Sequence, residues 1–227
     1  HAGIKNKTKV NINFVEAENL TTRNVNKTLK KADAVLVPGG FGERGVEGMI
    51  LACKFSRENN IPYLGICLGM QVAIIEYARN VLKLNGANST EFDQQTKHPV
   101  IGLITEWSDI SGKKEIRSKN SDLGGTMRLG GQLCMLKKKS KSYKMYKKEK
   151  IVERHRHRYE VNPKYKSEMI NNGLDVVGMS IDGKLVEMIE IPNHKWFLAC
   201  QFHPEFTSNP RDGHPIFNSY IKSTITK

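Results

Sequence analysis

Two short apolar segments, each running into a turn rich in glycine, most constrain how this 227-residue chain can fold. Ala34–Val37 ends at Pro38-Gly39-Gly40, and Ile61–Ile66 runs into Cys67. Longer stretches with the apolar spacing of a helix alternate with such segments. This alternation is typical of parallel β–α units, whose strands are covered by helices. The sequence therefore predicts an α/β fold with an open, mostly parallel sheet flanked by helices.

Other elements are expected along the chain. In the first half these are a strand at Val10–Ala17 and helices at Thr21–Lys31, Met49–Asn59 and Leu68–Arg79. The second half has additional strands of antiparallel character, expected at Val100–Glu106, Gly124–Leu136, Ile151–Val161, Asp175–Ser180, Leu185–Ile191 and Phe197–Phe202. The length suits one domain over residues 1–227. No apolar run approaches the roughly eighteen residues that span a membrane.

The run Gly65-Ile66-Cys67-Leu68-Gly69 places a cysteine between two glycines where a strand meets a helix. In this arrangement a nucleophile lies on a tight turn, which the glycines allow to close. A thiol there is near a helix N-terminus, which favours the thiolate, and the Leu68 N–H can point at a developing oxyanion. The alternative is that Cys67 is a small buried hydrophobic residue.

A base and an acid follow the apolar strand at Phe197–Phe202. His203 and Glu205 are two residues apart, so in extended backbone they lie on one side and Glu205 can orient the imidazole. Open α/β sheets bind their ligands at this end of their strands. The alternative is a turn histidine and a solvated glutamate. Together with Cys67, these residues predict a nucleophilic triad.

The loop after Val37 also points to this edge of the sheet. Backbone N–H groups of Gly39 and Gly40 are candidates to complete an oxyanion hole. A phosphate-binding loop is the alternative, but the Gly-Lys-Ser/Thr pattern is lacking here, which argues against nucleotide binding as the primary role of this loop.

The net charge of +13 suggests a polyanionic partner until its distribution is considered. Lys137–Lys150 alone holds eight lysines and one glutamate, a net +7. We interpret this segment as an exposed, solvated insertion, with binding to an acidic surface or nucleic acid as the less favoured alternative. Four widely spaced cysteines without a CxxC pair are too few for a disulfide framework and fit a reducing, cytoplasmic setting.

Arginine and histidine alternate from Arg154 to Arg158. In a strand the arginines share one face and His155 and His157 the other, which predicts an anion-facing edge and a separately packed pair. Two histidines without a neighbouring cysteine or acid cluster rarely bind zinc, so no metal site is expected.

At this point the chain resembles a known family. The runs around Cys67 and His203 resemble the class I (triad) glutamine amidotransferases, which have a flavodoxin-like fold. Further strings resemble the amidotransferase domain of CTP synthase, and the likeness extends from about Val35 to Phe217. These strings are Pro38–Gly48, Asn88–Phe92, Ile104–Trp107, Ser121–Gly130, Val152–Asn162 and Pro210–Pro215.

The resemblance implies a role for each matching residue. Cys67 attacks the side-chain amide of L-glutamine, His203 relays the proton to the leaving ammonia, and Glu205 orients His203. The oxyanion would be held by Gly39, Gly40 and Leu68, and the substrate by Gly40, Phe41, Leu68, Gln71, Glu91 and Arg158. In particular, Glu91 would meet the α-ammonium group and Arg158 the α-carboxylate, matching the bidentate geometry of a guanidinium.

The resemblance also implies partners outside this chain. An amidoligase domain would precede it, use UTP and ATP with magnesium, and receive the ammonia; a first strand–helix unit of the amidotransferase fold would also precede His1. GTP would activate the enzyme through a lid that includes Arg44, Gly45 and Glu47, and the full-length protein would be a homotetramer. No cofactor is expected in this domain itself. A stand-alone glutamine or γ-glutamyl hydrolase and a non-catalytic binding module are the remaining alternatives.

Overall fold

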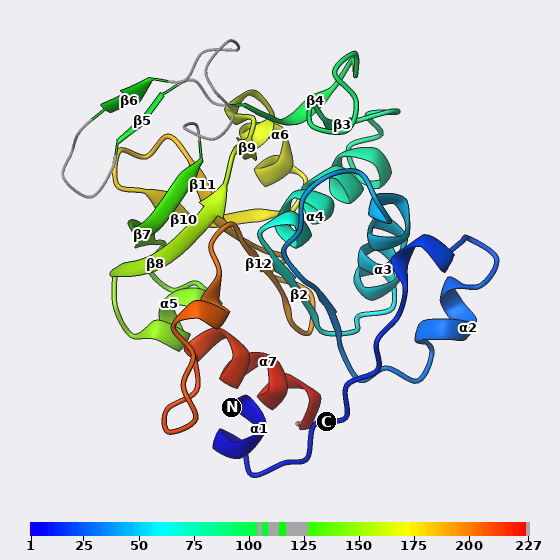
Figure 1. The fold of residues 1–227 in the computed structure, drawn as a ribbon, viewed down its shortest axis with the longest axis vertical. Helices are drawn as coiled ribbons and strands as arrows, with labels where there is room; N and C mark the ends of the chain where they lie inside the picture. Colours follow the sequence, from blue (N-terminus) through cyan, green and yellow to red (C-terminus); the bar gives the residue numbers. More distant parts are fainter. Residues whose placement is uncertain (104–105, 109–113, 117–126, 226–227) are drawn as a thin grey trace.

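The fold was analysed in a computed structural model that describes residues 1–103, 106–108, 114–116 and 127–225 (Figure 1). Parts of two strings noted above, Ile104–Trp107 and Ser121–Gly130, lie outside these residues, as do parts of two expected strands. Within the described ranges, no helix is long and apolar enough to cross a membrane.

A seven-stranded sheet organises the molecule, with strand order β1-β2-β12-β11-β10-β7-β8. Strands β1 and β2 are parallel, as are β2 and β12, whereas the other four pairings are antiparallel. The strands are β1 (Val35–Val37), β2 (Tyr63–Ile66), β7 (Arg128–Leu136), β8 (Lys150–His157), β10 (Asp175–Ser180), β11 (Val186–Glu190) and β12 (Phe197–Cys200).

The expected α/β fold, with an open sheet, flanking helices and additional antiparallel strands, is confirmed. The antiparallel share of the large sheet is greater than the sequence led us to expect, because β7, β8, β10 and β11 extend the same sheet. The turn at Asp182-Gly183 joins β10 to β11, and Gly183 has a φ of 71°.

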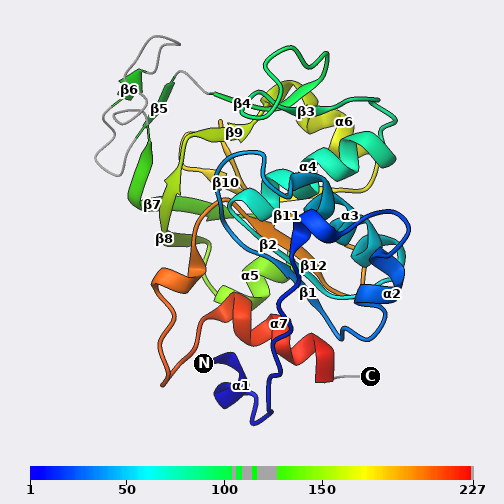
Figure 2. The same ribbon diagram turned by 45° about the vertical axis from the view of Figure 1, so that its right-hand side comes forward.

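Helices cover both faces of this sheet (Figures 1 and 2). Helices α3 (Val46–Glu58) and α4 (Leu68–Asn80) pack over a core that includes Tyr63 and Phe197. On the other face, α5 (Lys141–Tyr146) and α7 (Pro215–Ile225) cover a core that includes Leu64 and Trp196. Successive residues of β2 thus enter different cores, as the two-residue period of a strand requires.

Smaller elements complete the fold. Two minor sheets are formed by β3 (Asn88–Ser89), β4 (Pro99–Leu103) and β9 (Tyr159–Val161), and by β5 (Glu106–Ser108) and β6 (Lys114–Ile116). The remaining helices are α1 (Ala2–Lys5), η1 (Ala17–Asn19), α2 (Val25–Leu29), η2 (Pro163–Tyr165), α6 (Lys166–Asn171) and η3 (Pro204–Phe206). Helix α1 lies beside α7, where Asn6 Nδ2 donates to the Asn218 carbonyl at 3.0 Å.

The expectation of a strand at Val10–Ala17 is wrong. Residues 10–16 form no helix or strand, and η1 begins at Ala17. A strand requires a neighbour for its backbone groups, and among the described residues β1 pairs only with β2. The apolar side chains of the segment therefore face solvent, with Ile12 70% and Phe14 93% exposed.

The expectation that Lys137–Lys150 is an exposed insertion holds for most of its lysines, but the segment is not an irregular loop. The segment contains α5, whose N-cap residue Ser140 accepts a hydrogen bond from the Tyr143 N–H at 3.0 Å. Ser142 is fully buried. Its N–H and its hydroxyl both donate to Glu190 Oε1, each at 2.6 Å. Buried partners therefore anchor this basic segment to β11, even though most of its lysines face solvent.

Candidate active site

Cys67 lies at the turn between β2 and α4, where it is the N-cap residue of the helix. Its backbone has φ 53° and ψ −103°, an uncommon conformation for a residue with a side chain. Gly69 explains how the turn closes, because a Cβ there would lie 2.1 Å from the Val37 carbonyl oxygen. The predicted strand–nucleophile–helix turn is confirmed in its geometry.

The Cys67 thiol is 2% exposed, and this burial raises its pKa to about 12. A hydrogen bond from the Leu68 N–H lowers the pKa, whereas the negative charges of Glu160, Glu205 and Glu91 raise it. The helix N-terminus was expected to favour the thiolate, but in the free protein burial outweighs it. A neighbouring base is therefore needed to deprotonate Cys67 at neutral pH.

His203 follows β12 and is buried. Its backbone N–H donates to the Arg154 carbonyl at 2.8 Å, and its Nδ1 lies 2.6 Å from Glu205 Oε1. The ring stacks on Phe206, with centroids 5.0 Å apart. Nε2 is buried with no hydrogen-bond partner among the described residues, so this nitrogen is available for proton transfer.

Gly39 shows how closely the candidate nucleophile Cys67 and the candidate base His203 converge. A Cβ at Gly39 would lie 2.7 Å from His203 Cε1 and 3.4 Å from Cys67 Cβ. At Gly40, a Cβ would lie 3.1 Å from Leu68 Cδ2. The loop after β1 therefore runs directly past Cys67, Leu68 and His203, where its backbone N–H groups are candidates for an oxyanion hole.

The candidate glutamine-binding residues gather around the same loop. Glu91 Oε1 accepts the Gly42 N–H at 2.9 Å. Burial raises the pKa of Glu91, and the Gly42 N–H and the Arg158 charge lower it. Gln71 is buried in α4, and its Nε2 donates to the Tyr159 carbonyl at 3.1 Å.

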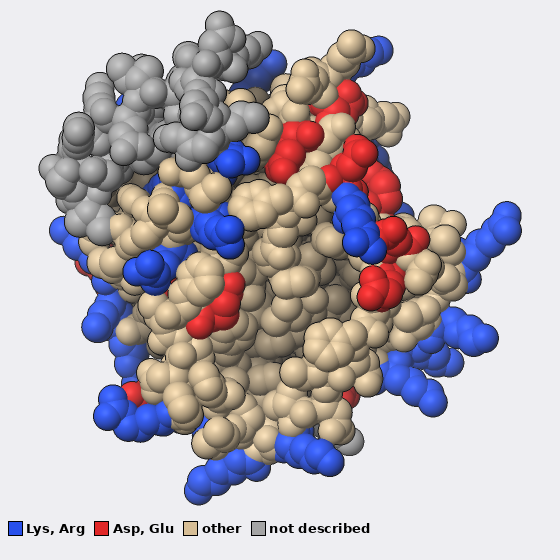
Figure 3. Space-filling model, viewed as in Figure 1, with Lys and Arg blue, Asp and Glu red and all other residues tan. Residues whose placement is uncertain are grey.

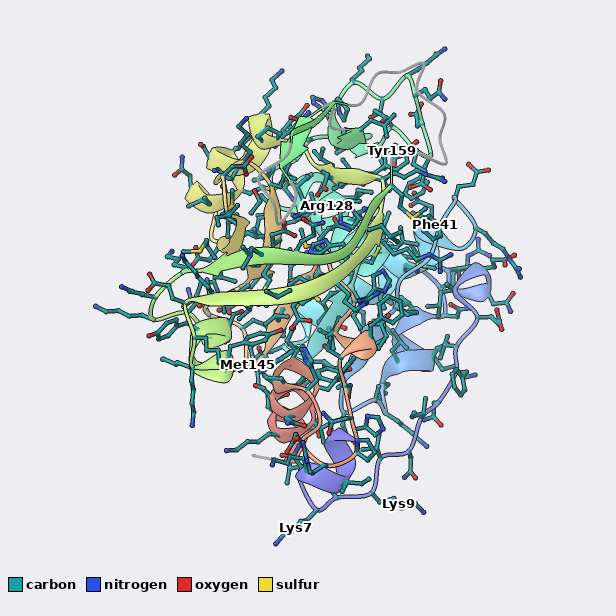
Figure 4. The ribbon with its side chains drawn as sticks, turned by 60° about the vertical axis from the view of Figure 1, so that its left-hand side comes forward. Lys7, Lys9, Phe41, Arg128, Met145 and Tyr159 are labelled. Atoms are coloured by element: carbon teal, nitrogen blue, oxygen red, sulfur yellow. The ribbon has the colours of Figure 1, made fainter. Side chains whose placement is uncertain are left out.

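Phe41, labelled in Figure 4, is half exposed at this loop. The guanidinium of Arg156 lies 5.8 Å from the centroid of its ring. In Figure 3, the face of the molecule that is turned to the viewer has a hollow at its centre, with mostly basic side chains on its left and mostly acidic ones at its upper right. Opposite charges on two sides suit a ligand that carries both an ammonium and a carboxylate group.

The residues of the expected lid lie at the start of α3. Gly45 is the N-cap residue of that helix, with a φ of 72°. Arg44 pairs with Glu18, and Glu47 Oε1 lies 2.9 Å from Arg79 Nη1. These ion pairs join the segment to η1 and α4, and neither partner is one of the catalytic candidates.

A buried network of charged and histidine side chains joins β7, β8 and β11. The sequence only partly predicted it. Arg128, labelled in Figure 4, is 1% exposed, and its Nη2 lies 2.6 Å from Glu187 Oε1. His155 Nδ1 lies 2.8 Å from His157 Nε2, which confirms that the two histidines share the buried face of the strand. Burial and the Arg128 charge lower the pKa of His155. No group of three or more His, Cys, Asp or Glu side chains within the described ranges is arranged to hold a metal ion.

Gln201 was not singled out in the sequence, yet it contacts the candidate nucleophile. It is fully buried, and its Nε2 lies 3.7 Å from Cys67 Sγ. A glutamine within the expected apolar strand Phe197–Phe202 was the available signal, but its partners come from distant parts of the chain.

Comparisons with known proteins agree with this geometry. The family model of the class I glutamine amidotransferases matches residues 1–223. The chain belongs to this family. Among solved structures, it is similar to the glutaminase domain of Trypanosoma brucei CTPS with bound acivicin, with a TM-score of 0.89 and 37% identity over 100% of this chain and 84% of that chain. The expected likeness to the amidotransferase domain of CTP synthase is thereby confirmed.

A second solved structure supports the fold alone. A putative GMP synthase subunit from Thermoplasma acidophilum matches with a TM-score of 0.56 and 13% identity, covering 98% of this chain and 83% of that chain. The catalytic and substrate-binding roles of individual residues stay predictions.

Proposed function

We propose that this amidotransferase domain hydrolyses L-glutamine to glutamate through a covalent intermediate on Cys67 and supplies the ammonia for amination of UTP to CTP. The single observation that carries the proposal is the convergence of Cys67 and the His203–Glu205 pair on Gly39. Family membership and the similarity to a CTPS glutaminase domain support the same reaction.

In the proposed mechanism, His203 Nε2 accepts the Cys67 proton as the sulfur attacks the amide carbon of glutamine. The Leu68 N–H, with those of Gly39 and Gly40, stabilises the oxyanion. The C–N bond then breaks, and His203 donates the proton to the departing ammonia. Water, deprotonated by His203, hydrolyses the γ-glutamyl thioester and releases glutamate.

Substrate contacts follow from the charges around the loop. Glu91 receives the α-ammonium group, and Arg158 grips the α-carboxylate. Gln71, Gly40, Phe41 and Leu68 border the space for the side chain. Because Glu91 already accepts the Gly42 N–H, binding at its carboxylate also fixes the loop that carries Phe41.

The fate of the ammonia rests on the resemblance. An amidoligase domain would consume it with ATP and magnesium, in a cytoplasmic homotetramer of the full-length protein. The same resemblance assigns ATP and magnesium to the amidoligase domain. GTP activation through Arg44, Gly45 and Glu47 belongs to the same proposal.

The glutaminase step is tested by replacing Cys67 with alanine and measuring ammonia release from glutamine. We expect loss of hydrolysis, whereas Cys53→Ala, in the buried part of α3, should retain it. A diazo-ketone analogue of glutamine should label Cys67, and glutamine should block the labelling. Equal ammonia release by Cys67→Ala and the parent would refute the assignment of the nucleophile.

Two further outcomes separate the alternatives. An absence of labelling and of hydrolysis in both the domain and the full-length chain would favour a non-catalytic binding module. Hydrolysis by a full-length chain that makes no CTP from UTP would favour a stand-alone hydrolase.

A further inference from the structure

Two buried glutamines connect the nucleophile to the edge of the site. Gln71 is 3% exposed and Gln201 is 0% exposed. Gln71 Nε2 lies 3.1 Å from the Tyr159 carbonyl oxygen and 3.4 Å from Gln201 Oε1. Gln201 Nε2 in turn lies 3.7 Å from Cys67 Sγ. Tyr159 begins β9 and is labelled in Figure 4.

The chemistry of these groups fixes the direction of each hydrogen bond in this series, from Tyr159 to Cys67. The Tyr159 carbonyl can only accept, so Gln71 must turn its NH₂ group toward it. The second N–H of that group then requires an acceptor, which is Gln201 Oε1. If the amide of Gln201 were flipped, its NH₂ group would face the NH₂ group of Gln71, and its oxygen would face Cys67 Sγ.

We propose that Gln201 is a positioning residue for the glutaminase reaction, donating an amide N–H to Cys67 Sγ and coupling the sulfur to Gln71. This inference rests on the proposed function, since it assumes that Cys67 is the nucleophile and that Gln71 borders the substrate. The backbone holds Gln201 in place as well, because its N–H donates to the Glu187 carbonyl at 2.9 Å.

The surroundings of Cys67 explain why a second donor matters. Burial and the charges of Glu160, Glu205 and Glu91 disfavour the thiolate, whereas the Leu68 N–H favours it. His203 lies across Gly39 and supplies the base. A neutral N–H donor stabilises negative charge on sulfur without adding a group that titrates, so Gln201 assists Cys67 at any pH.

The decisive variant is Gln201→Leu, which removes the amide at similar size. Alkylation of Cys67 by iodoacetamide is followed at several pH values between 7 and 9, below the Cys67 pKa of about 12, by mass spectrometry of its peptide. We expect the alkylation rate to fall about tenfold at each pH, because a pKa raised by about one unit leaves about tenfold less thiolate. In glutamine hydrolysis, kcat should fall about tenfold while KM changes less, because Gln71 keeps its bond to Tyr159.

Two further variants serve as a second test and as a control. Gln201→Glu places a carboxylate against the sulfur and should slow the alkylation of Cys67 further than Gln201→Leu. Gln132→Leu is the matched control, because Gln132 is also buried and donates to a backbone carbonyl, that of Leu129 at 3.4 Å. This control should leave the Cys67 profile unchanged.

The outcomes are distinguishable from those of the proposed function. An unchanged alkylation profile in both Gln201 variants would overturn the positioning role, even if the parent hydrolyses glutamine. Slower alkylation of Cys67 in the Gln201 variants of a protein that does not hydrolyse glutamine would sustain the contact to Cys67 and refute the glutaminase proposal instead.

Discussion

Val10–Val15 is rich in apolar side chains and Lys137–Lys150 is rich in lysine, yet the apolar side chains face solvent while the basic segment has a buried anchor. Phe14 is 93% exposed, whereas Ser142 in the basic segment is fully buried. Helix α5, with Met145 labelled in Figure 4, packs beside α7, while residues 10–16 form no helix or strand.

The difference teaches that specific partners decide burial in these segments. Three donors at the start of α5 share one carboxylate: the N–H groups of Lys141 and Ser142 and the Ser142 hydroxyl all donate to Glu190. Helix N-termini leave such N–H groups unsatisfied, and an acidic side chain there stabilises the helix. Val10–Val15 has apolar side chains, but the described residues provide no strand to pair with it.

The largest effect is expected from removing the carboxylate that anchors α5. Glu190→Ala leaves buried donors of Lys141 and Ser142 without an acceptor and should lower the free energy of unfolding by about 3 kcal/mol. Urea denaturation measures this. Glu149→Ala, in the exposed Lys138–Glu149 pair, is the control and should cost about 0.5 kcal/mol or less. Equal losses of stability in the two variants would show that Glu190 does not anchor α5.

A smaller effect is expected at the other end of α5. Tyr146 donates its hydroxyl to Glu153 Oε1 at 2.7 Å, and Glu153 also contacts His214 and Thr207, close to the His203–Glu205 turn. Tyr146→Phe should cost about 1 kcal/mol in urea denaturation. Tyr143→Phe is the matched control, since its bond to Ser140 uses the backbone N–H. Equal free energies of unfolding for the two variants would show that the Tyr146 hydroxyl does not anchor α5.

The smallest effect is expected in the apolar segment. Phe14→Ser should change the free energy of unfolding by about 0.5 kcal/mol or less, because the side chain is already in solvent. Leu64→Ser, in the core on β2, is the contrasting control and should be severely destabilising. If a strand–helix unit preceding His1 covers the segment in a longer protein, Phe14→Ser should there cost about 2 kcal/mol.

Much of the catalytic candidate site could be predicted because its determinants are local. The turn at Cys67 depends on the neighbouring Gly69, and His203 and Glu205 are only two residues apart. The alternation of Arg154–Arg158 similarly foretold the buried histidines, because a strand alone sets that period.

The rest depended on contacts between segments distant in sequence. Val10–Ala17 has the composition of a strand, but pairing is a tertiary property, and no neighbour for it is present among the described residues. Lys137–Lys150 looked like a solvated insertion because Glu190, which anchors it, is 48 residues from Ser142 along the chain. The contact of Gln201 with Cys67 likewise joins positions 134 residues apart.

Gly39 has a consequence for redesigning the specificity of this protein. Between the His203 ring and Cys67 there is too little space for even one carbon atom added at Gly39. Gly39 therefore cannot be replaced without displacing one of these two side chains. Under the proposed function, Phe41, two residues along the same loop and half exposed, is the side chain to exchange when a bulkier amide is to be admitted.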